Sequence, residues 1–103
     1  MKMKTSELIG PALDWAVAKC EVGAEFIGEI DDPHFYSTDW AQGGPIIERE
    51  EIALWPDAEG GWLASADNGK GCDFHGPASL IAAMRCYVAS KLGDEVNIPE
   101  GLE

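Results

Sequence analysis

Apolar residues recur at helical spacing in two stretches, one near each end of the chain. In residues 11–21 the stripe on one side of the helix consists of Leu13, Ala16, Val17 and Cys20. Trp15 falls roughly opposite that stripe. We therefore expect an N-terminal helix that turns its stripe to the core. Trp15 then packs under another layer, contacts a second subunit or lines a ligand site.

The second helical pattern covers residues 77–92 and stops at Gly93. Its apolar arc is formed by Ile81, Met84, Val88 and Leu92. Arg85 falls on the same arc, where a guanidinium needs a partner because an unpaired buried charge is costly. Two roles are open for Arg85: an ion pair with Asp39, Glu48 or another acid at the core edge, or a grip on the phosphate or carboxylate of a ligand.

Strand-like patterns lie between the two helices. Residues 52–55 and 62–66 read as a hairpin joined by the turn sequence PDAEGG. Asn68-Gly69 allows a third strand around residues 72–74. Shorter strands are expected at residues 24–30, at the N-terminal arm and around Val96 and Ile98. The sequence thus predicts an α+β fold in one domain, residues 1–103, with a small antiparallel sheet (the hairpin plus short strands) flanked by an N-terminal and a C-terminal helix.

Residues 36–49, with the sequence YSTDWAQGGPIIER, predict a loop that runs into a short helix. Gly44 suits the N-cap and Pro45 the first helical position, while Ser37 or Asp39 can cap an earlier turn. Free backbone N–H groups beside Trp40 suit a small anionic or planar ligand. The candidate ligand-binding residues are Tyr36, Ser37, Thr38, Asp39, Trp40, Gln42, Gly43, Gly44, Arg49 and Arg85. The competing interpretation is that the aromatics of this loop plug the sheet.

Charge and composition narrow the classes of function. The net charge is −12, which argues against direct binding of nucleic acid through its phosphates. Excess carboxylates keep a small protein soluble, or they imitate nucleic acid in the basic groove of a partner. No apolar run is long enough to span a membrane, and MKMKTSEL lacks the apolar segment of a secretory signal, so we expect a cytoplasmic protein. The three cysteines are expected to be reduced thiols.

Catalytic patterns are weak, and we expect neither an enzyme nor a cofactor. Cys72 and His75 suggest a nucleophile and its base, but residues three apart on a strand point to opposite faces. The two histidines, His34 and His75, have no metal-ligand spacing. Asp31 and Asp32 are typical of a solvated turn. A small core makes a homo-oligomer reasonable.

Three strings carry a resemblance to a known family: YSTDWAQGGPIIERE, LDWAVAKCE before it and GPASLIAAMRCYVASKLGDEVNIP after it. From Lys4 to Pro99 the chain resembles the NinX family, small accessory proteins of temperate lambdoid-type phages. A looser similarity to phage α/β/α sandwich domains implies a small antiparallel sheet flanked by helices. The family supplies no catalytic or binding residues to carry over.

The resemblance implies an accessory role inside an infected bacterium, where small phage proteins often counter host defence. Our first hypothesis is a non-catalytic protein that sequesters a small nucleotide-like signalling molecule. The base would be held by Tyr36, Trp40 and Gln42, with Gly43, Gly44, Arg49 and Arg85 near the phosphates. The alternative is an acidic interaction module that inhibits a host DNA-binding or nuclease protein by imitating DNA.

Overall fold

The computed structural model describes residues 2–22, 35–66, 74–99 and 101. The α+β class is confirmed, with helices and short antiparallel strands in the described residues. In chain order the elements are β1 (Lys2–Lys4), the 3-10 turn η1 (Thr5–Glu7), α1 (Gly10–Val22), α2 (Trp40–Glu50), β2 (Ala53–Pro56), β3 (Trp62–Ser65), β4 (Phe74–Gly76), α3 (Ser79–Leu92) and β5 (Glu95–Asn97).

The described strands form two sheets where the sequence suggested one. The predicted hairpin is confirmed as β2 and β3, and β4 pairs with β3 on the other side. The closing strand β5 instead pairs with β1, with Met3 opposite Val96. The expected strand at residues 24–30 and the turn at residues 68–69 lie outside the described residues.

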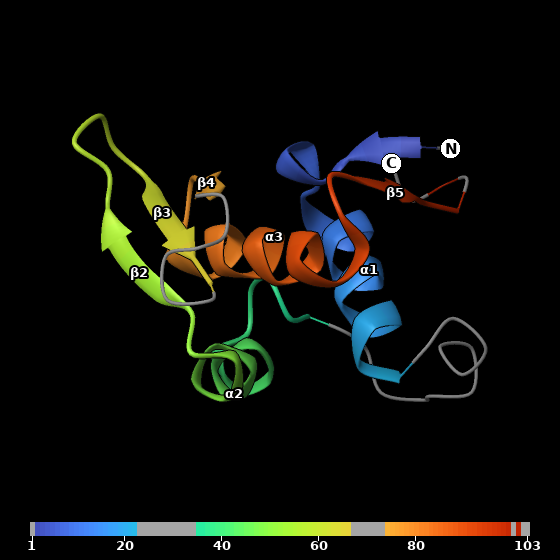
Figure 1. The fold of residues 1–103 in the computed structure, drawn as a ribbon, viewed down its shortest axis with the longest axis horizontal. Coiled ribbons are helices and arrows are strands. Elements are labelled where there is room, and N and C mark those ends of the chain that lie inside the picture. Colours follow the sequence, from blue (N-terminus) through green and yellow to red (C-terminus); the bar gives the residue numbers. More distant parts are fainter. Residues whose placement is uncertain (1, 23–34, 67–73, 100, 102–103) are drawn as a thin grey trace.

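Helix α3 lies in the middle of the molecule. Figure 1 shows the three-stranded sheet at one end of α3, α1 with the β1–β5 pair at the other, and α2 alongside. Because neighbours cover α3 on several sides, burial extends well beyond the predicted arc. The buried residues of α3 are Leu80, Ala82, Ala83, Met84, Arg85, Cys86, Tyr87 and Val88. Ile81 and Leu92, which we expected on the inward arc, are only partly buried.

Helix α1 confirms the predicted stripe. Leu13, Ala16 and Val17 are fully buried, whereas Cys20 is half-buried. Trp15 packs partly against the core from the opposite side, and the ammonium of Lys19 lies 5.5 Å from the centre of its ring. Trp15 is thus partly buried against the core, and its contact with a second subunit or a ligand stays a prediction.

Helix α2 corrects the prediction for its start. It begins at Trp40, with Asp39 as the N-cap, so Gly44 is not the N-cap and Pro45 lies inside the helix. A proline at this position removes the N–H that would reach the carbonyl of Ala41. The Asp39 carboxylate fixes the helix start, since its Oδ1 accepts from the N–H of Ala41 at 2.9 Å. The helix therefore starts at the Asp39 cap and not at the position that Pro45 predicted.

Candidate functional site

The turn at the start of the candidate loop is fastened to α1. The N–H and the hydroxyl of Ser37 both donate to Oδ1 of Asp14, at 2.8 and 2.7 Å. Ser37 and Asp14 are 2% and 6% exposed. A buried carboxylate requires such partners, because burying it without hydrogen bonds is costly. Ser37 thus holds the loop in place and its hydroxyl is engaged inside the protein.

The backbone N–H groups that we expected to be free are also engaged. Those of Thr38 and Asp39 donate to the carbonyl of Phe35, at 3.1 and 2.7 Å. The N–H of Phe35 donates to Oε1 of Gln42 at 2.9 Å, and Nε2 of Gln42 donates to Asp39 at 3.4 Å. This part of the chain is a closed turn and cap, and it offers no row of donors to an anion. The expectation of free N–H groups here was wrong.

The two glycines of α2 serve packing. A Cβ at Gly43 would collide with the carbonyl oxygen of Tyr36 and lie 2.7 Å from Cδ1 of Leu80. Gly43 therefore lets α2 approach the loop and α3 closely. A Cβ at Gly44 would meet only Cε3 of Trp40, at 3.6 Å. The indole of Trp40 thus lies over Gly44 on the outside of the helix.

The two aromatics of the loop have different surroundings. Tyr36 is half-buried and packs against the core, and burial raises the pKa of its hydroxyl. Trp40 is 54% exposed, and neighbouring Phe35 is 48% exposed. Single exposed hydrophobic side chains are normal on protein surfaces, so its exposure leaves Trp40 free for a contact without requiring one. The plug interpretation fits Tyr36, whereas Trp40 stays available.

Arg49 belongs to a polar cluster that joins all three helices. Its guanidinium donates to both carboxylate oxygens of Glu21, at 3.1 and 2.6 Å, and to Glu50 at 2.9 Å. The hydroxyl of Tyr87 accepts from Arg49 at 3.2 Å and donates to Glu21 in a short bond. The bonds from Arg49 hold the pKa of Glu21 below its usual value. Lys91 completes the cluster, 3.4 Å from Glu50.

Trp40 and Arg49 do not meet. They are nine residues apart in one helix, which places them on opposite faces and roughly 13 Å apart along the axis. A single small ligand on Trp40 is therefore shielded from Arg49 by the helix itself. The binding roles of the ten candidate residues stay a prediction, but the fold does not bring them to one place.

Arg85 corrects one of its two predicted roles. It is 9% exposed, and no carboxylate among the described residues forms an ion pair with it. Its Nε donates to the carbonyl of Leu8 at 2.7 Å, and its Nη1 to the carbonyl of His75 at 2.8 Å. Burial lowers the pKa of the guanidinium. Arg85 thus ties the end of η1 to β4, since backbone oxygens rather than acids reach it.

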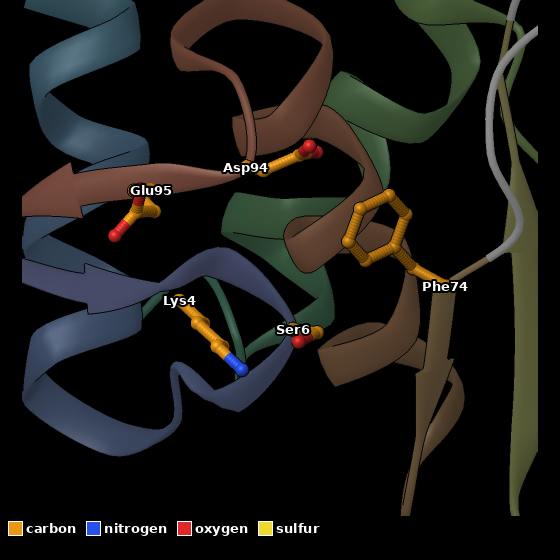
Figure 2. A pocket seen from close by; sticks show the side chains of 5 residues that line it. All are labelled: Lys4, Ser6, Phe74, Asp94 and Glu95. Atoms are coloured by element: carbon orange, nitrogen blue, oxygen red, sulfur yellow. The ribbon is translucent and has the colours of Figure 1, made fainter.

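A pocket of about 320 Å³ opens between β4 on one side and β1, η1 and the start of β5 on the other. It is lined by Lys4, Ser6, Phe74, Asp94 and Glu95. Figure 2 shows Lys4 and Ser6 on the N-terminal segment, Asp94 and Glu95 just after α3, and the Phe74 ring on the opposite wall. The volume is at the lower end of the roughly 300–1,000 Å³ typical of small-molecule sites.

Arg85 joins the two walls of this pocket. One of its partners, Leu8, is two residues after Ser6, and the other, His75, follows Phe74 directly. Sequence reasoning missed the pocket, because its lining comes from three separate stretches with no shared motif. The only signal was Arg85 itself, an inward cation that had to be bonded to something.

The pocket is lined by one aromatic ring, that of Phe74, and by polar and charged side chains of both signs. Lys4 and Glu95 are opposite each other in the β1–β5 register. In the described part of the chain, neither Lys4 nor Asp94 nor Glu95 forms an ion pair within 4.0 Å. These three charges therefore face solvent and remain available to a ligand.

The described residues carry no cluster of metal ligands and no helix fit to span a membrane. No group of three or more His, Cys, Asp or Glu side chains there is arranged to hold a metal ion. None of the helices that the structure describes has the length and apolar character needed to cross a membrane. His75 pairs with Asp57 at 3.0 Å, while Cys72, His34, Asp31 and Asp32 lie outside the described residues.

Comparison with known protein families places most of the chain in one of them. The family model described as bacteriophage P22, NinX, matches residues 4–91 of the 103. The matched region includes α1, α2, the three-stranded sheet and nearly all of α3. No curated protein matches the chain.

Proposed function

Because the chain belongs to the NinX family of bacteriophage P22, we propose that this phage accessory protein acts by binding, without catalysis. Its first proposed role is to counter host defence by capturing a small nucleotide-like signalling molecule. The observation that carries this proposal is the pocket between β4 and the N-terminal and C-terminal segments that form β1, η1 and β5. It combines a partly open cavity, an aromatic ring and a lysine that forms no ion pair with the described residues, which the loop at residues 36–49 does not.

Each lining residue has a part in this proposal. The Phe74 ring stacks on a planar base, a contact worth about 1–3 kcal/mol per base in other proteins. Asp94 accepts hydrogen bonds from ribose hydroxyls or from an exocyclic amine, as acidic residues do in dinucleotide sites. The ammonium of Lys4 pairs with a phosphate. Ser6 adds one hydroxyl at the rim.

The charge of the pocket limits the ligand. One ammonium and two carboxylates leave a net negative charge, in a chain whose net charge is −12. A triphosphate would be repelled at this site. The proposed ligand is therefore a molecule with few phosphate charges, such as a cyclic nucleotide or a cyclic derivative of ADP-ribose.

Isothermal titration of the purified protein against cyclic and ADP-ribose-derived nucleotides tests the proposal. Binding is expected with at least one of them, weakened about tenfold in Phe74→Ala. Trp40→Ala is the matched aromatic control and should bind like the wild type. If Trp40→Ala alone lost nucleotide binding, the binding site would be the loop at residues 36–49 and not the pocket. Absence of heat with every nucleotide, from a folded protein, would refute ligand capture.

Chromatography of the same mixtures tests the absence of catalysis. The nucleotide should be recovered unchanged after release from the denatured protein. A new product that forms with time would make the protein an enzyme. Light scattering of the free and the loaded protein tests the expected homo-oligomer.

The second proposed role is an acidic interaction module that occupies a basic host protein. Two observations favour it. Trp40 on α2 is exposed. Both arginines are bonded to other groups of the same chain, Arg49 to Glu21 and Arg85 to the carbonyl of Leu8. With Arg49 and Arg85 bonded internally, the excess of carboxylates dominates the surface. Binding to host protein should then fall steeply as salt rises, and should not respond to Phe74→Ala.

A further inference from the structure

We infer that one face of α2, formed by Trp40, Gly44, Glu48 and Glu51 and here named the α2 face, docks onto a protein that surrounds an apolar hollow with lysines and arginines. This inference rests on the second proposed role. It adds the surface that makes the contact and the chemistry of the partner. The indole of Trp40 enters the hollow, and the two glutamates meet the basic rim.

The residues of the α2 face share one side of the helix. Trp40, Gly44 and Glu48 follow at intervals of four, which stacks them along the axis, and Glu51 is the C-cap of the helix. Trp40, Glu48 and Glu51 are exposed. Since Gly44 has no side chain, the indole of Trp40 lies close to the helix backbone. No side chain therefore projects from the helix between Trp40 and Glu48 on this face. Tryptophan is among the residues most often found as interface hot spots.

The opposite side of α2 is occupied by the protein itself. Gly43 and Ile46 are buried, and Arg49 is bound by Glu21 and Glu50. The one cation of the helix is therefore turned away from the α2 face and neutralised. Glu48 and Glu51 have no ion pair among the described residues. The α2 face thus offers only negative charge around its aromatic.

Charge complementarity selects the partner. Nucleic acid and anionic membranes are repelled by a chain of net charge −12. A second copy would bring the same glutamates together, and like charges across an interface are unfavourable. A basic protein surface satisfies both the carboxylates and, through an apolar hollow, the indole. We therefore commit the α2 face to a basic protein partner.

An NMR titration of the full chain with a short helical peptide of leucine and lysine tests this inference. The indole N–H signal of Trp40 and the backbone signals of Gly44 and Glu48 should shift. Trp40→Ala should weaken binding by about 30-fold, the effect of losing a hot spot. The double variant Glu48→Gln/Glu51→Gln should weaken binding by about tenfold at low salt.

The matched control is Glu7→Gln/Glu59→Gln, which removes two exposed carboxylates elsewhere on the chain. It should change the affinity by less than about twofold. An equal loss in both double variants would overturn the inference, because the attraction would then be diffuse. Shifts at Asp94 in place of Trp40 would also overturn it, while leaving the second proposed role standing. No binding at all would refute both, and the nucleotide titrations would remain an independent test of ligand capture.

Discussion

Replacement of Arg85 by methionine is expected to cost more stability than any other single charge removal in the described residues. Methionine keeps much of the length and apolar bulk of the side chain but removes both donors. The bonds to the carbonyls of Leu8 and His75 measure 2.7 and 2.8 Å. Hydrogen bonds from charged groups contribute about 1.5–3 kcal/mol each, so two of them give roughly 3–6 kcal/mol.

Part of that energy is returned, because the variant no longer buries a charge. The carbonyl of Leu8 then stays buried without this donor, which costs about 1–3 kcal/mol. The expected net loss is about 3 kcal/mol, a large fraction of the roughly 5–15 kcal/mol of a typical domain. Arg85→Lys should lie between methionine and the wild type, because an ammonium cannot reach two carbonyls with the fork of a guanidinium.

Urea unfolding followed by circular dichroism at pH 7 gives these free energies, and the slope with denaturant should stay constant. Arg49→Met is the matched control, since its ion pairs are at the surface and its side chain is 51% exposed. It should lose at most about 1 kcal/mol. If Arg85→Met loses no more than Arg49→Met, the assignment of Arg85 as the link between η1 and β4 is refuted.

Two further predictions concern packing and pH. Gly43→Ala should destabilise the fold by about 2 kcal/mol or more, because the added Cβ meets the backbone of Tyr36. Gly44→Ala should be neutral or stabilise the fold by up to about 1 kcal/mol, because alanine has the higher helix propensity. A comparable loss of stability at both positions would contradict the packing role of Gly43. The hydrogen bonds from Arg49 hold the pKa of Glu21 in the folded protein below its value in the unfolded chain. The stability that Glu21 contributes is therefore fully present above the unfolded pKa and is lost as the pH falls through the folded pKa. The stability gap between wild type and Glu21→Gln should therefore narrow between pH 6 and pH 3 in urea unfolding, and a gap that widens would show that the sign is wrong.

The helices and the hairpin were predictable because their information is local. The stripe in α1, the stop at Gly93 and the turn between β2 and β3 depend on residues within a few positions of one another. The start of α2 was not, because a cap at Asp39 and a proline six residues later give opposing local signals. The contact of Gly43 with Leu80, on another helix, is absent from any local pattern.

The sequence by itself determined the α+β class, the inward position of Arg85 and the family to which the chain belongs. Only the tertiary structure decided what each charged or aromatic side chain faces. In the folded chain Arg49 pairs with Glu21, Arg85 donates to two backbone carbonyls and Trp40 is exposed. It also assembled the pocket from residues as distant as Lys4 and Glu95. Periodicity tells which side of an element turns inward, but which partner lies there depends on how the elements are placed, and that is a non-local property of the whole chain.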